Sequence, residues 1–314
     1  MARRLLVIWS VWAALHGYVG ERLLAHAPVG LAGRVAGWAA IALLAVAPLA
    51  AFAALWSRRA PERPGAAALE WVGFTGVGLS SLLIVFVVAA DVLHVRAWLG
   101  PGGFAAGVVG AALAVLLAGV WRARRPGVVR VRVPIARLPP DLEGLRIVQL
   151  SDLHVGPTLK RNFVERVVRI TNDLAPDLVA LTGDVADGFP RALRDEVAPL
   201  ADLSAPLGKY FVTGNHEYYW DAAGWMRELE RLGFRVLANA HQMLQRGSGR
   251  LLLAGVTDPS GTRQDPGRGS DAARAVSGAP ASDVRVLLAH QPRSAYAART
   301  LGFDLQLSGH THGG

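Results

Sequence analysis

The sequence of 314 residues contains no cysteine. Disulfide bonds and thiolate metal ligands are therefore excluded, so any metal chemistry must use histidine, asparagine and carboxylate side chains. Lysine is scarce as well, because only Lys160 and Lys209 are lysines among the 33 basic residues. Charged residues make up 18% of the chain and hydrophobic residues 52%. This composition is too apolar for an ordinary soluble protein.

Acidic residues are few in the first 135 positions. That part carries thirteen arginines and four acidic residues, whereas the remainder carries equal numbers of basic and acidic groups. The net charge of +9 therefore belongs to the apolar first part of the chain. Because the second half is neutral overall, we expect no nucleic-acid binding.

Four apolar stretches account for the high hydrophobic content. They cover residues 5–20, 35–56, 71–90 and 97–121. A helix needs about 20 apolar residues to cross a bilayer core, so the pattern predicts an N-terminal α-helical transmembrane region of about four helices within residues 1–125. The first stretch also fits the apolar part of a signal peptide, but no small-residue cleavage motif clearly precedes a soluble domain. We interpret it as a retained helix.

Arginines gather in alternate loops of this region. They precede the first stretch, lie between the second and third, and follow the fourth, while the other loops hold few. The positive-inside rule then places the N-terminus, the middle loop and the second half of the chain in the cytoplasm. His16, Asp91 and His94 lie in or near the apolar stretches. A functional role inside the membrane or simple contact with headgroup water both fit these three residues.

The second half shows a different pattern, which begins after a linker at residues 126–144 that contains proline and alternating valine and arginine. Apolar runs typical of strands cover residues 146–150, 178–181, 209–212, 250–256, 284–289 and 303–307. Between them, residues 162–174 and 222–232 show helical periodicity; Asn162 is the expected N-cap of the first helix, and Gly233 ends the second. Residues 260–282 are typical of a mobile surface loop. The sequence therefore predicts an α/β domain.

Five short polar motifs follow the predicted strands. They are SDLH at 151–154, TGD at 182–184, GNHE at 214–217, AHQ at 289–291 and GHTH at 309–312. Loops at the carboxyl ends of strands converge on one crevice, and in extended backbone two residues separated by one position share a face. Oxygen and imidazole ligands suit divalent cations, and two such ions can activate water and hold a phosphoryl group. The motifs together predict a dinuclear metal site.

The ordered series SDLH, TGD, GNHE, AHQ and GHTHGG resembles the calcineurin-like metallophosphoesterase superfamily, and the resemblance covers residues 145–314. It implies a four-layer α/β domain in which helices flank two mixed β-sheets. Members usually continue beyond the last motif with further strands, so the domain is expected to be truncated at its C-terminus. Combined with the apolar helices, the resemblance points to the membrane-attached branch of the superfamily.

The resemblance also implies a role for each matching residue. One metal ion would be bound by Asp152, His154 and His312, and Asp184 would bridge the two ions. The second ion would be completed by Asn215, His290 and His310. The ions expected are two divalent cations such as Mn, Fe, Zn or Co.

Other residues near the motifs have less certain roles. His216 would stabilise developing charge or protonate the leaving oxygen. His216 and Asp184 are therefore the expected catalytic residues. We interpret Glu217 as a structural group. Asp187, Asp258 and Arg293 also lie close enough in sequence to contact a substrate.

The expected function is that of a membrane-anchored metal-dependent phosphodiesterase or pyrophosphatase. Its expected partners are the lipid bilayer and a phosphodiester or pyrophosphate, and the resemblance suggests UDP-2,3-diacylglucosamine of lipid A synthesis at a bacterial inner membrane. Tethering would raise the effective concentration of such a lipid-linked substrate. Two alternatives stay open. One is a nucleotide phosphodiesterase that the helices merely anchor, and the other is a membrane scaffold or sensor that binds metal without turnover.

Overall fold

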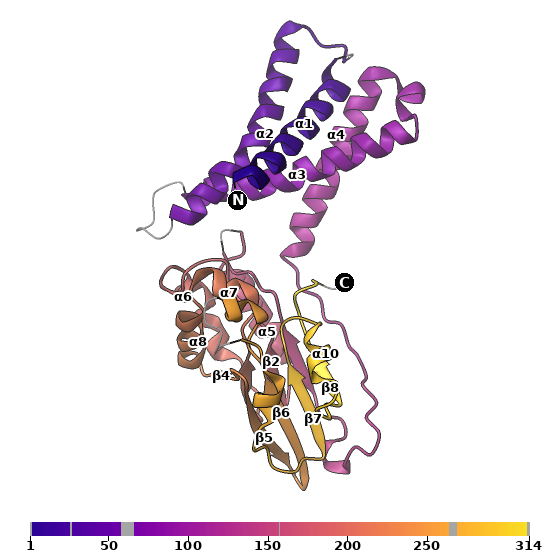
Figure 1. The fold of residues 1–314 in the computed structure, drawn as a ribbon. Helices are drawn as coiled ribbons and strands as arrows, with labels where there is room; N and C mark the ends of the chain where they lie inside the picture. Colours follow the sequence, from indigo (N-terminus) through magenta and orange to yellow (C-terminus); the bar gives the residue numbers. More distant parts are fainter. Residues whose placement is uncertain (1, 26, 58–65, 157, 264–268, 313–314) are drawn as a thin grey trace. The chain divides into compact units, whose positions relative to one another are not determined.

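The computed structural model of the chain describes residues 2–25, 27–57, 66–156, 158–263 and 269–312. Contacts divide the chain into two compact units, Met1–Gly127 and Val128–Gly314. The first unit is entirely helical in its described residues, and the second contains all the strands found there (Figure 1). The boundary between them lies inside the segment that we interpret as a linker.

The first unit contains four long helices. They are α1 (Ala2–Leu24), α2 (Leu31–Ser57), α3 (Ala66–Val92) and α4 (Val95–Ala123). Three candidate membrane spans lie within α2, α3 and α4, and they cover Leu31–Ala53, Ala68–Val92 and Val95–Ala123. The predicted count of about four is therefore corrected to three candidate spans among the described residues. The first helix forms as predicted, but polar residues such as His16, Glu21 and Arg22 leave it less apolar than the others.

Polar side chains inside this helical unit are paired with one another. His16 of α1 is buried, and its Nε2 lies 3.0 Å from the Ser80 hydroxyl of α3. Arg22 of α1 forms an ion pair with Asp91 at the end of α3, and Tyr18 also donates to this carboxylate. Because an unpaired polar group is costly in an apolar medium, these contacts join α1 to α3 and satisfy His16 and Asp91. His94 is exposed instead, and its Nδ1 lies 3.1 Å from Val92 O.

Two four-stranded sheets form the second unit, in the strand orders β1-β2-β3-β4 and β5-β6-β7-β8. The strands of the first sheet are β1 (Ile147–Leu150), β2 (Leu178–Leu181), β3 (Lys209–Phe211) and β4 (Arg235–Val236), all parallel. Those of the second are β5 (Ala240–Arg246), β6 (Gly249–Gly255), β7 (Val284–Leu288) and β8 (Leu305–Leu307), of which only β5 runs antiparallel to its neighbour. The second sheet is mixed, as expected, whereas the first is wholly parallel.

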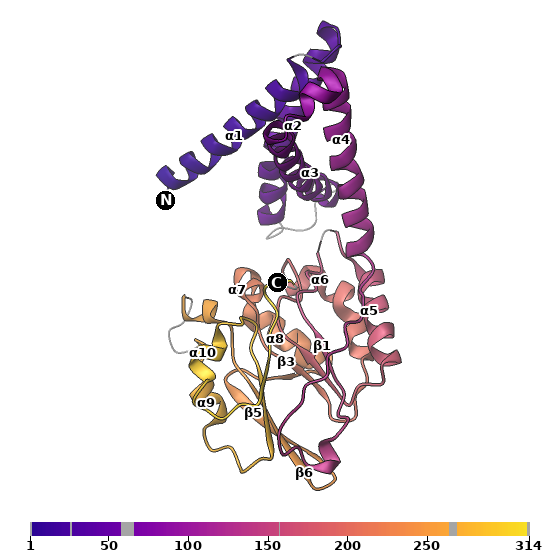
Figure 2. The ribbon, with the colours of Figure 1, turned by 90° about the vertical axis from the view of Figure 1, so that its right-hand side faces the viewer.

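Helices cover the outer faces of both sheets. They are α5 (Arg161–Asp173), α6 (Pro190–Val197) and α8 (Ala222–Arg231) on the first sheet, and α9 (Ala272–Val276) and α10 (Ser294–Ala298) on the second. A further helix, α7 (Asn215–Trp220), begins just after the carboxyl end of β3. Short 3-10 helices cover Pro140–Leu142, Ala198–Asp202 and Pro259–Arg263. In Figure 2, α5 lies to one side of the strands, with α9 and α10 to the other.

Three apolar cores hold these layers together. One packs α5, α6 and α8 on the first sheet and includes Trp225, which is fully buried. A second lies between the sheets and joins Leu178 and Ala180 to Leu253 and Val286. The third packs α9 and α10 on the second sheet. Helices, sheet, sheet and helices therefore form the four-layer α/β domain that the sequence predicts.

Several local predictions need correction. Lys160, rather than Asn162, is the N-cap of α5, and no side-chain cap bond is made there. The segment 260–282 contains α9 and one 3-10 helix in its described part, so it is not simply a surface loop. In contrast, α8 ends just before Gly233, whose φ of 86° is the left-handed conformation that glycine adopts at low cost.

Candidate metal centre

Every motif lies just beyond the carboxyl end of a strand. Asp152 and His154 follow β1, Asp184 follows β2, and Asn215 and His216 open α7 after β3; His290 follows β7, and His310 and His312 follow β8. The two sheets thus bring the ends of five strands to one place, because their inner faces pack against each other. Local sequence places each polar cluster, and sheet topology makes the clusters neighbours.

The backbone of these loops is unusual. Asp152, His154, Asp184, His310 and His312 all have positive φ, with values between 45° and 70°. Non-glycine residues in this left-handed region are uncommon, and each costs on the order of 1 to 3 kcal/mol unless its surroundings hold it. Here the neighbouring loop does so, since Asp152 N–H donates to Gly183 O and His154 N–H to Asp184 O, both at 3.1 Å. Strain concentrated in one cluster is typical of a functional site.

This conformation corrects one detail of the sequence argument. Asp152 and His154 were expected to share a face because their backbone is extended, as were His310 and His312. All four residues are left-handed instead. Asp152 and His154 still lie in one group of candidate ligands, whereas His310 and His312 belong to two different groups.

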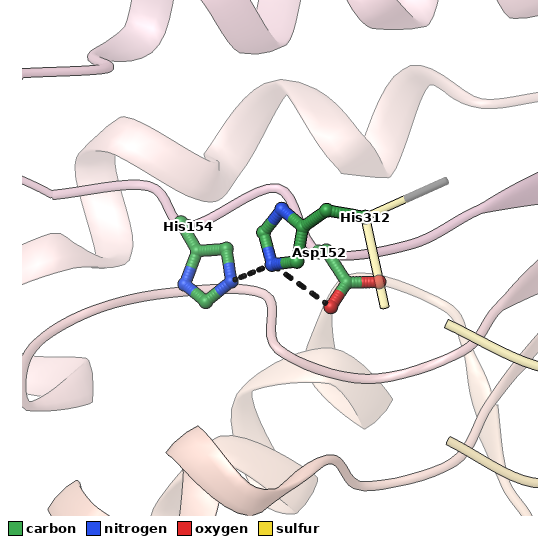
Figure 3. A group of neighbouring side chains, drawn as sticks. All are labelled: Asp152, His154 and His312. Atoms are coloured by element: carbon green, nitrogen blue, oxygen red, sulfur yellow. Dashed lines mark hydrogen bonds and ion pairs between the residues drawn. The ribbon is translucent and has the colours of Figure 1, made fainter. Parts of the chain in front are cut away.

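The first group of candidate ligands consists of Asp152, His154 and His312, whose ligand atoms lie within 4.8 Å of one another. His312 Nε2 lies 3.2 Å from His154 Nε2 and 3.5 Å from Asp152 Oδ1. Figure 3 shows that the same His312 ring nitrogen lies next to both His154 and Asp152. These are the three residues that the resemblance assigns to one ion.

The second group consists of Asp184, His290 and His310. His290 Nε2 lies 3.2 Å from Asp184 Oδ2 and 3.1 Å from Asn215 Oδ1. The rings of His290 and His310 are edge to face, with centroids 5.1 Å apart. Asn215 therefore lies beside this group, and the structure brings together the residues assigned to the other ion.

Asp184 lies between the two groups. Its Oδ2 is 3.9 Å from His154 Nε2 on one side and 3.2 Å from His290 Nε2 on the other. The carboxylate is almost completely buried. Burial alone would raise the pKa of Asp184, but hydrogen bonding to His290 and the nearby histidines lower it below the usual range. An ionised carboxylate in this position is suited to bridge two cations.

The hydrogen bonds of the histidines test whether these residues suit a cation. His154 Nδ1 lies 3.1 Å from Asp187 Oδ2, and His290 Nδ1 lies 2.7 Å from Thr182 O. Because each partner only accepts, each Nδ1 carries a hydrogen, and Nε2 directs a lone pair at the cluster whenever it carries no proton. This arrangement, in which the remote nitrogen is anchored by an acceptor, is typical of histidines that bind metals. The donor set therefore fits divalent cations.

The electrostatics of His290 lead to the same conclusion. Its ring is buried, which alone would lower its pKa, but the bond to Asp184 and the charges of Asp184 and Asp152 raise the pKa to about 9. With no other cation nearby, the ring itself would hold the positive charge. The carboxylates thus favour a cation at this position, and a metal ion would replace the proton of His290.

His216 differs from the other histidines of the site. Its backbone N–H donates to Asp184 Oδ1 at 2.9 Å, and its ring Nε2 lies 4.0 Å from Asp184 Oδ2. His216, His154 and Asp184 form a third group whose ligand atoms lie close together. Nδ1 of His216 is bonded to Asp187. Burial alone lowers the pKa of His216, but Asp187 and Asp184 outweigh it and raise the pKa above the ordinary value. The ring is suited to carry a proton beside the Asp184 carboxylate.

Asp187 contacts more of the site than its sequence position alone indicates. The two oxygens of this carboxylate bond Nδ1 of His154 and Nδ1 of His216, at 3.1 and 2.5 Å. Burial would raise its pKa, but the two imidazoles lower it well below the usual range. Its position three residues after Asp184, in the same loop, was the signal in the sequence. Asp187 orients two rings of the site at once.

The remaining residues near the motifs have other surroundings. Glu217 is fully buried and accepts hydrogen bonds from the N–H groups of Asp184, Val185 and Gly214. Burial and the charge of Asp184 raise its pKa to about 7, against the lowering effect of those bonds. Asp258 is buried and accepts from Gln291 Nε2 and Ser260 N–H. Its carboxylate is thus used inside the fold.

The second half of the chain matches a known protein family. The family described as calcineurin-like phosphoesterase matches residues 145–314, which is more than half of the chain. The matched region begins just before β1 and includes every candidate ligand. The resemblance inferred from the five motifs is thereby confirmed.

Similar proteins include two from vertebrates and one from a bacterium. Proteins named "Transmembrane protein with metallophosphoesterase domain" from Danio rerio and Bos taurus are 40% and 41% identical, over 61% of this chain and 46% of their own length. A metallophosphoesterase of Aquifex aeolicus is 35% identical over 60% of this chain and 70% of its own length. The chain spans about half the length of the vertebrate relatives that it matches.

Proposed function

The chain belongs to the calcineurin-like phosphoesterase family, and we propose on that basis that it is a membrane-anchored phosphoesterase with two divalent metal ions. One observation carries the proposal. A single buried carboxylate, that of Asp184, lies between Nε2 of His154 and Nε2 of His290, which belong to the two groups of candidate ligands. The two groups correspond to one ion each, with Asp152, His154 and His312 in the first and Asn215, His290 and His310 in the second.

The chemistry follows from these positions. A pair of divalent cations supplies Lewis acidity, which activates water for attack on phosphorus and neutralises the phosphoryl group. Asp184 keeps the two ligand groups together. His216 holds a proton on Nε2, because Asp187 stabilises its positive charge through Nδ1. We propose that His216 gives this proton to the leaving oxygen.

A substrate carried by a lipid is the form of the proposal that best uses the whole chain. Three helices are long and apolar enough to cross a membrane, and they precede the phosphoesterase domain in the same polypeptide. Tethering of this kind raises the effective concentration of a phosphodiester or pyrophosphate that lies in the bilayer. UDP-2,3-diacylglucosamine is one such compound. The arginine distribution further supports a phosphoesterase domain on the cytoplasmic side.

The test is hydrolysis of a panel of phosphodiesters by the full chain in detergent, loaded with Mn²⁺. The panel contains UDP-2,3-diacylglucosamine, a water-soluble diester and a cyclic nucleotide. Asp184→Asn is expected to lose both bound metal and turnover, since it removes the bridging charge. His216→Ala is expected to keep its metal and to lose turnover by about a hundredfold or more.

The outcomes separate the alternatives. Preference for the lipid-linked compound supports the proposal, whereas equal rates on all three compounds would indicate a nucleotide phosphodiesterase that is merely anchored. Bound metal without any hydrolysis would indicate a scaffold or sensor. Unchanged turnover in both variants would contradict the roles given to Asp184 and His216.

A further inference from the structure

Helix α7 carries an exposed aromatic residue beside the candidate metal centre. Tyr219 is four residues after Asn215, so the two side chains share one face of the helix. Asn215 is buried, whereas Tyr219 is 61% exposed. The Tyr219 ring also lies 5.0 Å from the His216 ring, measured between centroids. A large aromatic side chain exposed at this position has no role in the function proposed above.

Tyr219 makes a hydrogen bond to the Asn215 amide. Asn215 Nδ2 donates to the Tyr219 hydroxyl oxygen at 3.3 Å, and Asn215 Oδ1 lies 3.1 Å from His290 Nε2. The amide oxygen therefore faces His290, and the amide nitrogen faces Tyr219. An oxygen is the atom that a cation requires here.

The hydroxyl group of Tyr219 has a further capacity. A phenol accepts hydrogen bonds on its oxygen and donates one through its hydrogen. The oxygen accepts from Asn215, and in the part of the chain that the structure describes no acceptor is found for the hydrogen. Because the side chain is exposed, that hydrogen can reach a molecule that enters from solvent. The Tyr219 hydroxyl is thus bonded to the same amide whose oxygen is a candidate metal ligand, and its ring lies beside His216, the proposed proton donor.

We propose that the Tyr219 hydroxyl donates a hydrogen bond to a non-bridging phosphoryl oxygen of the substrate. The inference rests on the proposed function, since it assumes that a phosphoryl group occupies the site. A charged acceptor makes such a bond shorter and stronger than a bond between neutral groups. Tyr219 then has two functions, because it orients the ligand Asn215 and contacts the phosphoryl group that the site holds.

The experiment measures phosphate binding and turnover separately from metal binding. The full chain in detergent is loaded with Mn²⁺, its metal content is determined by elemental analysis, and inorganic phosphate is titrated by calorimetry. Tyr219→Phe keeps the ring and removes the hydroxyl. Tyr218→Phe is the matched control, because this neighbour is buried and its hydroxyl bonds Thr213 instead.

We expect Tyr219→Phe to retain its metal and to bind phosphate roughly ten- to hundredfold more weakly, as loss of a hydrogen bond to a charged group predicts. KM for a phosphodiester should rise accordingly. Tyr218→Phe should bind phosphate as the wild-type chain does. A second substitution, Tyr219→Ala, should weaken phosphate binding about as much as Tyr219→Phe, since the hydroxyl is the group that acts.

Three results would overturn the inference. Loss of metal from Tyr219→Phe, with unchanged phosphate affinity of the remaining loaded protein, would show that Tyr219 acts only through Asn215. Equal phosphate affinity in the wild-type chain and Tyr219→Phe would show that the hydroxyl makes no contact. If the loaded wild-type chain neither bound phosphate nor hydrolysed any diester, the proposed function would fail together with this inference.

Discussion

Glu217 offers the sharpest test of how the fold holds the candidate site. Its carboxylate is fully buried and accepts from three backbone N–H groups. Oε2 accepts from Asp184 and Gly214 at 3.0 and 2.6 Å, and Oε1 accepts from Val185 at 2.8 Å. These bonds join the loop after β2 to the start of α7. Since the same two segments carry Asp184, Asn215 and His216, Glu217 fixes the distance between them.

The substitution Glu217→Gln has a cost that can be worked out from these bonds. The amide keeps one oxygen, which is best placed to accept from Asp184 and Gly214. Its NH2 group then faces the Val185 N–H, so one buried donor is left without an acceptor. Such a group costs about 1 to 3 kcal/mol. In a domain of 150–250 residues each kcal/mol shifts Tm by roughly 2 to 4 °C, so a drop of about 2 to 12 °C is expected.

The assay is scanning calorimetry of the detergent-solubilised chain at pH 8. This pH lies above the raised pKa of Glu217, about 7, so the wild-type carboxylate is ionised and accepts all three bonds. Glu217→Ala would leave three donors unpaired and cost about 3 to 9 kcal/mol, comparable to the whole stability of a domain. The control is Glu165→Gln, which removes an exposed ion pair with Arg161 and should change Tm by about 1 °C or less. A Tm for Glu217→Gln within 1 °C of the wild type would refute the reasoning.

Three further predictions follow from the site and the helices. Asp187→Asn should lower kcat by at least about tenfold, because it weakens the positive charge on His216 and disturbs its orientation; a kcat equal to the wild type in a steady-state assay would contradict this. Chelation of divalent ions should lower the Tm of the phosphoesterase domain, and added Mn²⁺ should raise the Tm again in proportion to the logarithm of the Mn²⁺ concentration. A Tm that changes with neither treatment would exclude a bound ion. Because the chain lacks cysteine, single cysteines introduced at Val29, Leu93 and Val129 report the membrane topology directly. An impermeant maleimide added outside the cell should label the first two positions and leave the third unlabelled. The reverse labelling pattern would show that the orientation is opposite to the predicted one.

Much of the architecture was readable from the sequence. The strands of the second unit other than β4 and β5 are short and mostly apolar, and each was predicted to within a few residues. β2, β6 and β7 are buried along most of their length, which leaves a nearly continuous apolar pattern. The two missed strands lack that pattern. β4 has two residues, and β5 carries polar side chains along most of its length. The helical region was likewise predicted, but the described residues hold three candidate spans rather than about four, because polar residues leave α1 less apolar than the other helices.

The identity of the candidate ligands was also a property of the sequence, because an apolar run followed by Asp, Asn or His places polar groups at the end of a buried strand. Their arrangement was decided by tertiary structure alone. The left-handed backbone at Asp152 and His154 is held by hydrogen bonds to the loop after β2, about thirty residues away in the chain. The links from Asp187 to His154 and His216 are equally non-local. Local patterns determine which residues form a strand and its terminal loop, but only the packing of two sheets against each other decides which loops meet.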